Sequence, residues 1–151
     1  MPHIHEKIDF TADVFIVHKN KVLLRKHDKY HAWLCVGGHI ELDEDPNQAA
    51  IREVKEEVGL DIKLMGGPRI IDDTESHQEL IRPRFLNIHR IDATHQHIGF
   101  TYFATSDTDH VIPERPEDEW KWVTEDELNT MDLKPHVRLY AAYALRELNT
   151  V

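Results

Sequence analysis

The feature that most constrains this chain is one short helix whose ends and two faces can be read from residues 37–60. Asp45 is a favourable N-cap, Pro46 suits the first helical position, and Gly59 suits a left-handed helix end. The spacing therefore predicts a helix over Pro46–Val58, with Gln48 placed to complete a capping box. An apolar stripe would hold this helix against a core, and its members are Ala50, Ile51, Val54 and Val58.

The opposite face of the same helix would carry Glu53, Glu56 and Glu57, at i, i+3 and i+4. Like charges at this spacing cost about 0.2–0.5 kcal/mol per pair, and Arg52 and Lys55 are not well placed to neutralise all three. One interpretation is a solvated acidic face, with the glutamates mostly exposed. The other is a site for Mg²⁺ or Mn²⁺, because hard cations prefer carboxylate oxygens.

Strand-like segments dominate the rest of the chain. Runs of β-branched and aromatic residues between turn signals predict strands at residues 9–17, 21–26, 32–36, 61–66, 68–73, 82–93, 97–106 and 119–123. A tight turn at Lys19-Asn20 would join the first two strands. The third would run into Gly37-Gly38, where the backbone can approach a ligand closely.

Two further helices complete the pattern. Thr124 and Glu127 form a capping-box pair that predicts a short helix, and an apolar stripe predicts a last helix over Pro135–Leu148. Many strands with one helix in the middle and others at the end indicate a mixed sheet with helices packed on it.

Length and charge narrow the classes of protein. The 151 residues are enough for one domain with its own core, and we expect residues 1–151 to form a single domain. The formal net charge of −10 argues against a binder of polymeric nucleic acid or of a membrane surface. It leaves room for an anionic small molecule, because bound cations can reverse the local field.

Cysteine and histidine content also bear on the class. Cys35 is the single cysteine, which excludes an internal disulfide framework; with no secretory signal or membrane-spanning run, it predicts a cytoplasmic protein. The 12 histidines are scattered and form no HxxxH or HExxH pair. We therefore expect them to be surface and strand residues rather than metal ligands.

The acidic helix carries a longer pattern of fixed spacing. Gly38, Glu44, Arg52-Glu53-Val54, Glu56-Glu57 and Gly59-Leu60 together resemble the complete Nudix box. The box is often preceded by Pro-Gly-Gly, whereas this chain has Val36-Gly37-Gly38, a change that removes no ligand. The resemblance implies an α+β fold, an α/β/α sandwich with a mixed β-sheet between helices. It also implies hydrolysis of a nucleoside diphosphate linked to another moiety, with Mg²⁺ or Mn²⁺ as cofactor.

The resemblance also implies roles for individual residues. Arg52 would orient the catalytic glutamates through a salt bridge, and Glu44 would support the site. Whether Glu53 or Glu56 takes the proton of the attacking water stays open. The implied metal ligands are the side chains of Glu53, Glu56 and Glu57 and the carbonyl oxygen of Gly37.

Candidate residues outside the helix complete the expected site. Similar Nudix enzymes often use a further acid ahead of a late strand, and Glu114 lies at the matching distance before Glu119-Trp120. The alternative for Glu114 is a solvated acidic loop. Residues that could contact phosphate are Arg25, Gly38 and His39, and aromatic residues that could stack on a base are Tyr30, Trp33, Phe85 and Phe103.

The leading functional prediction is MutT-like hydrolysis of a (deoxy)nucleoside triphosphate, with a small nucleotide as partner. A nucleotide-sugar or dinucleotide pyrophosphatase is the alternative within the same class. A non-catalytic Nudix domain that senses nucleotides, and an unrelated acidic scaffold protein, are alternatives from other classes. The sequence leaves the oligomeric state open.

Overall fold

The computed structural model describes residues 7–27, 29, 31–67 and 74–148. A mixed eight-stranded sheet runs through this part of the chain, with the order β3-β2-β1-β7-β5; β4 also pairs with β1, β6 with β7, and β8 with β2. The β1–β7 pair is parallel, and the other pairs are antiparallel. The strands are β1 Ile8–His18, β2 Lys21–Lys26, β3 Trp33–Leu34, β4 Val36–His39, β5 Ile62–Leu64, β6 Phe85–Arg90, β7 Gln96–Ser106 and β8 Trp120–Val123.

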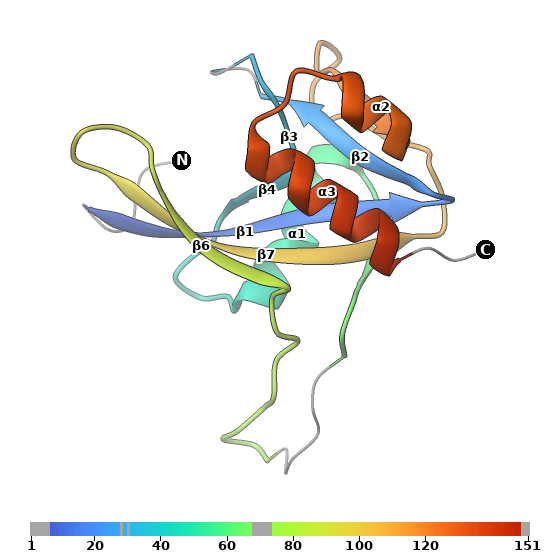
Figure 1. The fold of residues 1–151 in the computed structure, drawn as a ribbon. Helices are drawn as coiled ribbons and strands as arrows, with labels where there is room; N and C mark the ends of the chain where they lie inside the picture. The colour runs from blue at the N-terminus through green and yellow to red at the C-terminus, as the bar shows by residue number, and fades with distance from the viewer. Residues whose placement is uncertain (1–6, 28, 30, 68–73, 149–151) are drawn as a thin grey trace.

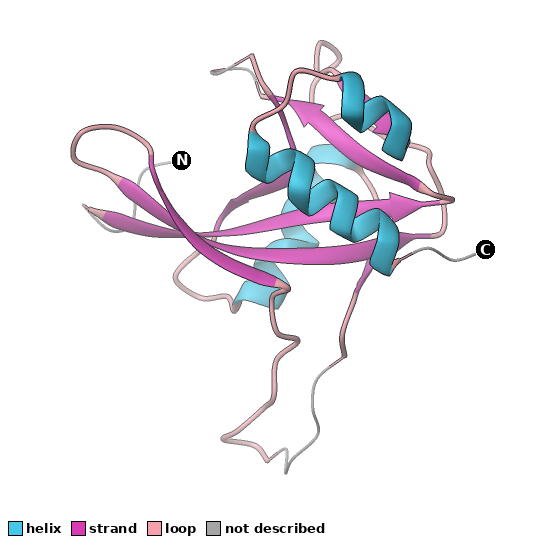
Figure 2. Ribbon diagram, viewed as in Figure 1, coloured by secondary structure: helices cyan, strands magenta, loops and turns pink. Residues whose placement is uncertain are grey.

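Helices cover both faces of this sheet (Figures 1 and 2). The helix α1 (Pro46–Val58) lies on one face, and α2 (Glu125–Thr130) and α3 (Pro135–Glu147) lie on the other. Each face has its own apolar cluster, one containing α1 residues and the other α2 and α3 residues. The predicted α+β fold, with a mixed sheet between helices, is confirmed.

The strand β1 lies at the centre of both clusters. Val14 and Ile16 pack in the cluster that contains α1, while Phe15 and Val17 pack in the cluster that contains α3. Successive side chains of a strand point to opposite faces, so an unbroken apolar run suits a strand that is buried on both sides. The predicted turn follows directly, since Lys19 and Asn20 have φ angles of 46° and 64°.

The helix α1 has the ends that the sequence predicts. The carboxylate of Asp45 accepts a hydrogen bond from the Gln48 amide, and the Gln48 side chain accepts one from the Asp45 amide. Gly59 ends the helix with a φ of 70°. The predicted faces are partly wrong, because Ile51 is 47% exposed whereas Glu53 is 8% exposed. Ala49, Ala50, Val54 and Val58 form the buried stripe instead.

Several predicted boundaries also change. The single strand expected at residues 32–36 is two strands, β3 pairing with β2 and β4 pairing with β1. Gly37 and Gly38 therefore lie inside β4 rather than after a strand. The strand expected at residues 68–73 falls outside the described residues. Among the described helices, none is both long and apolar enough to cross a membrane.

Candidate active site

The double glycine of β4 makes room for a glutamate of α1. A Cβ atom built on Gly38 would overlap the carboxylate of Glu53, and one built on Gly37 would overlap the backbone of β1. Because Gly38 has no side chain, the Glu53 carboxylate can lie against β4 and become buried. This close approach explains why Glu53 departs from the exposed position expected for it.

Glu57 is held by a backbone donor and by an arginine. Its Oε1 accepts a hydrogen bond of 2.9 Å from the Gly37 amide, and its Oε2 lies 2.9 Å from Nη1 of Arg25. Desolvation raises the pKa of Glu57 to about 7, against the opposing charge of Arg25. The carboxylate is therefore fixed beside β4 at a cost in solvation that the arginine only partly offsets.

Arg52 connects the other acidic residues of the site. Its Nε and Nη2 donate to the two oxygens of Glu44, at 2.9 and 2.6 Å, in a bidentate pair. Its Nη1 donates to Glu53 Oε1 at 3.0 Å and to Glu56 Oε2 at 3.2 Å. Nη2 also donates to the His39 carbonyl oxygen at 3.0 Å. Hydrogen bonds from Arg52 lower the pKa of Glu44 and so keep this carboxylate ionised.

The three glutamates thus share two arginines. Arg52 contacts Glu53 and Glu56, whereas Glu57 pairs with Arg25 from β2, and Lys55 pairs with the exposed Asp61 at 3.1 Å. Burial raises the pKa of Glu53 as well as that of Glu57. Oxygen donors that are desolvated and incompletely neutralised suit a hard divalent cation, so this group fits Mg²⁺ or Mn²⁺.

The loop before β8 places two acidic residues near this group. Glu114 is exposed, its amide donates to the Glu57 carbonyl oxygen at 3.2 Å, and its charge contributes to the raised pKa of Glu57. Asp118 is 8% exposed and pairs with Nη2 of Arg25 at 3.4 Å. Although desolvation opposes it, hydrogen bonds and the Arg25 charge lower the pKa of Asp118. Nothing in the sequence distinguishes Asp118 from the other acids of this loop, and its contact with Arg25 appears only in the folded chain.

Asp13, a half-buried acid in the middle of β1, is not among the residues that the sequence singles out. The Asp13 carboxylate packs directly against Gly37 and Gly99, where a Cβ atom would come within 2.9 and 2.8 Å of its oxygens. It accepts a hydrogen bond of 3.2 Å from the Thr11 hydroxyl. Desolvation raises the pKa of Asp13 to about 6. The available signal was an acidic residue within an otherwise apolar stretch of a central strand.

The side chains expected to contact substrate mostly contact other residues of the chain instead, either in ion pairs or in an apolar cluster. Arg25 is engaged by Glu57 and Asp118, as described above, and the His39 ring lies toward Asp9, with Nε2 3.6 Å from Oδ2. Phe85 and Phe103 pack edge to face in the cluster that contains α3. Trp33 packs at the border of that cluster, and Tyr30 lies outside the described residues.

A model of the NUDIX domain matches residues 8–143 of the chain. The chain belongs to the NUDIX family. Among solved structures, it is similar to a hydrolase of the NUDIX family from Clostridium perfringens, with a TM-score of 0.83 and 37% identity. That match covers 93% of this chain and 97% of the other.

Two curated relatives of this NUDIX chain are named for the same substrate. One is a "Probable DHNTP pyrophosphohydrolase" from Lactococcus lactis, 32% identical over 99 residues, which are 66% of this chain and 55% of the relative. The other is a "Dihydroneopterin triphosphate diphosphatase" from Haemophilus influenzae, 40% identical over 77 residues, which are 50% of this chain and 48% of the relative. The chain thus spans about half the length of these relatives.

Proposed function

We propose that this NUDIX protein hydrolyses a pyrophosphate bond of a nucleoside diphosphate linked to another moiety, and that its substrate is a (deoxy)nucleoside triphosphate. We take residues 1–151 as the single domain that does so. The observation that carries the proposal is the Arg52 network, which holds Glu44, Glu53 and Glu56 together beside the double glycine of β4. An acidic scaffold without a catalytic role would have no need for this arrangement.

In the proposed reaction, a water oxygen forms a bond to phosphorus while the bridging bond of the pyrophosphate link breaks. The leaving group departs as diphosphate when a nucleoside triphosphate is cut between its α and β phosphorus atoms. Arg52 would fix the orientation of Glu53 and Glu56, one of which accepts the proton of the attacking water. Because Glu53 is buried and has a raised pKa, it is the favoured acceptor of the two.

The glutamates Glu53, Glu56 and Glu57 and the carbonyl oxygen of Gly37 would hold Mg²⁺ or Mn²⁺, with Glu114 as a further ligand from its loop. A divalent cation in such a site neutralises phosphate oxygens and lowers the pKa of a bound water. Arg25 would keep Glu57 in place rather than contact phosphate directly, since its guanidinium is occupied by Glu57 and Asp118. Gly38 would contribute by leaving room for the Glu53 carboxylate beside β4.

A pterin triphosphate is a second candidate substrate. The names of the two curated relatives favour it, because both specify dihydroneopterin triphosphate or its abbreviation. Both candidates end in a triphosphate chain, so the acidic site would serve either one. They differ in the group at the far end of that chain.

The test is a panel of substrates incubated with the protein and Mg²⁺. It contains the eight common nucleoside triphosphates, dihydroneopterin triphosphate, a nucleotide sugar and a dinucleoside polyphosphate, with release of diphosphate and monophosphate as the readout. We expect diphosphate release from a triphosphate, and its loss on thorough chelation and in Glu57→Gln. Turnover of the sugar or dinucleotide substrate alone would replace the proposal with the alternative of the same class. Nucleotide binding without turnover of any substrate would show a sensing module.

A further inference from the structure

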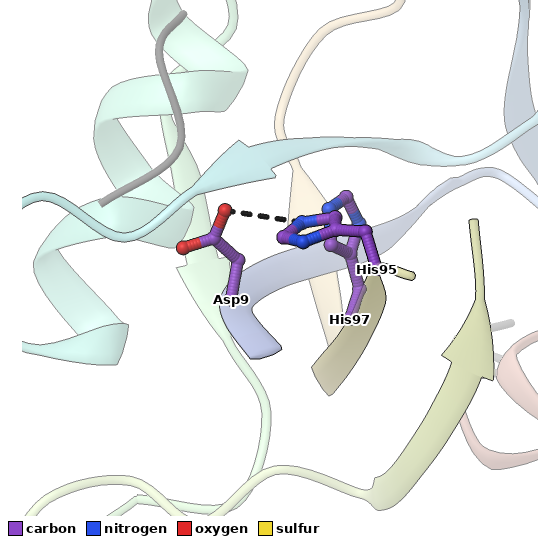
Figure 3. Close-up of side chains that lie close together, drawn as sticks. All are labelled: Asp9, His95 and His97. Carbon is purple, nitrogen blue, oxygen red and sulfur yellow. Dashed lines mark ion pairs between the residues drawn. The ribbon is translucent and has the colours of Figure 1, made fainter. Parts of the chain in front are cut away.

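A second group of possible metal ligands lies where β1 and β7 begin (Figure 3). Asp9 comes from β1, and His97 is its partner in the parallel register of β7. His95 precedes β7, and its Nε2 lies 3.3 Å from Oδ2 of Asp9. One ligand atom from each of the three residues lies within 4.8 Å of the others.

Asp9 and His95 are buried, His97 is half-buried, and all three lie outside residues 38–60, which carry the Nudix box. Asp9 is 2% exposed and His95 is 5% exposed, so the carboxylate is shielded from solvent. Asp13, which borders the glutamate site, follows four residues later on β1, about 13 Å further along the strand. Figure 1 shows the start of β1 and the β6–β7 loop extending beyond α3.

Two further imidazoles lie beside these residues, one near Asp9 and one near His97. His39 Nε2 lies 3.6 Å from Oδ2 of Asp9, and the His39 and His97 rings are 4.9 Å apart at their centroids. The His89 ring lies 5.7 Å from that of His97. The sequence predicts scattered histidines, and this is wrong for these four, because the pairing of β1 with β4 and β7, and of β7 with β6, brings them together.

We propose that Asp9, His95 and His97 form a binding site for a transition-metal ion of the zinc type, distinct from the Mg²⁺ or Mn²⁺ site proposed for the glutamates. Imidazole with one carboxylate is a donor set typical of Zn²⁺, whereas hard cations prefer oxygen alone. In a tetrahedral zinc site with bonds of about 2.0–2.1 Å, neighbouring ligand atoms lie about 3.4 Å apart. The 3.3 Å between His95 and Asp9 matches this separation, and His39 is placed to be a fourth ligand.

A bound ion would join the first residues of β1 to those of β7. These are the ends of the parallel pair, and the ion would add a cross-link where α3 does not cover the strands. The competing interpretation is a metal-free cluster in which Asp9 pairs with protonated histidine. The two differ in whether a stoichiometric metal ion binds with nitrogen ligands.

The experiment uses the full chain without an affinity tag, treated with chelator and then dialysed. Zn²⁺ is titrated by calorimetry in excess Mg²⁺, which occupies the glutamate site, and Co²⁺ is added separately as a spectroscopic probe. We expect one Zn²⁺ per chain, a higher melting temperature on binding, and the intense visible absorption of tetrahedral Co²⁺ with nitrogen ligands. His95→Asn should weaken Zn²⁺ binding at least tenfold, since even the loss of residues that support a ligand costs about 10–100-fold.

His110→Asn is the matched control, because His110 is exposed and lies outside the cluster; it should bind Zn²⁺ as the unmodified chain does. Should His95→Asn fail to fold in chelator, His97→Gln replaces it, since His97 is less buried. Zn²⁺ binding that survives His95→Asn or His97→Gln but is lost in Glu53→Gln would assign the ion to the glutamate site and overturn the proposal. Absence of a stoichiometric Zn²⁺ or of the tetrahedral Co²⁺ spectrum would overturn it as well. Neither result depends on whether the protein hydrolyses a triphosphate.

Discussion

The start and the middle of β1 each border a polar group, and the two groups differ in the atoms that they offer to a metal ion. Near Asp13, the neighbouring groups are glutamates held by Arg52 and Arg25, and every candidate metal ligand is an oxygen. Near Asp9, one carboxylate lies among imidazoles. Donor type, rather than the number of acidic residues, therefore separates a site for a hard cation from a site for a borderline one.

Burial shifts the pKa values of the two regions in opposite directions. It raises the pKa of Glu57 to about 7, and it lowers the pKa of His97 to about 4, helped by the neighbouring imidazoles of His39, His89 and His95. Desolvation favours the neutral form of each group. A neutral imidazole is already the form that binds a metal ion, whereas a carboxylate has to lose its proton first. Because the two regions have no candidate ligand in common, they should respond independently to substitution.

The largest effect should come from Glu57→Gln or Glu53→Gln. Each change removes one negative oxygen donor beside β4, and we expect kcat to fall by about 10²–10⁴-fold while Zn²⁺ binding at Asp9 is unchanged. Steady-state kinetics at saturating Mg²⁺ and Zn²⁺ calorimetry measure the two properties. His95→Asn is the converse control, which should bind Zn²⁺ at least tenfold more weakly and keep its turnover. Wild-type turnover in either glutamine variant would remove that glutamate from the site.

A smaller loss, of about 10²-fold in kcat, is expected for Arg52→Ala. The guanidinium of Arg52 holds Glu44, Glu53 and Glu56 at once, so its removal releases all three side chains. Lys55→Ala is the matched control on the same helix, because Lys55 pairs with the exposed Asp61, and it should stay within about twofold of wild type. Arg52→Lys should not restore activity, since an ammonium cannot form the bidentate pair. Equal losses in Arg52→Ala and Lys55→Ala would show that Arg52 contributes only its positive charge.

The sequence predicts the features of the glutamate region that depend on local structure. Caps at Asp45 and Gly59 act within a few residues of the chain, so the limits of α1 could be stated in advance. The burial of Glu53 could not, because it depends on Gly38 in a strand that packs against the helix. A helical periodicity gives two faces but does not say how much space the facing strand leaves.

The histidine region could not be predicted, because its members are distant in sequence. Asp9 and His97 become neighbours through the parallel pairing of β1 with β7, and His39 joins them through the antiparallel pairing of β4 with β1. No spacing rule for metal ligands covers residues on three separate strands. The division of residues 32–39 into β3 and β4 was missed for a similar reason, since each half pairs with a different strand.

Asp13, which borders the glutamate region, should make stability depend on pH. Its folded-state pKa of about 6 is above the ordinary value of 3.8, so the folded state binds its proton more tightly than the unfolded state. The stabilisation this provides is full below pH 3.8 and is lost as the pH rises to about 6. Asp13→Asn should remove that loss and be more stable than wild type at pH 8 by about 2 kcal/mol, with little difference at pH 3.5.

Thermal and urea unfolding in chelator at several pH values test this expectation. Asp107→Asn is the control, because Asp107 is exposed, and its stability should follow that of wild type at every pH. An Asp13→Asn curve parallel to wild type between pH 4 and 8 would show that Asp13 does not carry the shift. Zn²⁺ binding by Asp13→Asn should stay unchanged, because Asp13 is not one of the proposed zinc ligands.

The smallest effect is expected for Glu114→Gln, which tests how far the glutamate region extends into the loop before β8. The Glu114 amide is bonded to the Glu57 carbonyl oxygen, and its charge acts on the Glu57 carboxylate. If its carboxylate adds one oxygen to the bound cation, the variant should need about 3–10-fold more Mg²⁺ for half-maximal activity, a change of roughly 1 kcal/mol. Glu117→Gln is the matched control, since Glu117 is exposed in the same loop. A higher Mg²⁺ requirement in the Glu117 variant alone would move the role there, and no change in either would confine the ligands to α1 and β4.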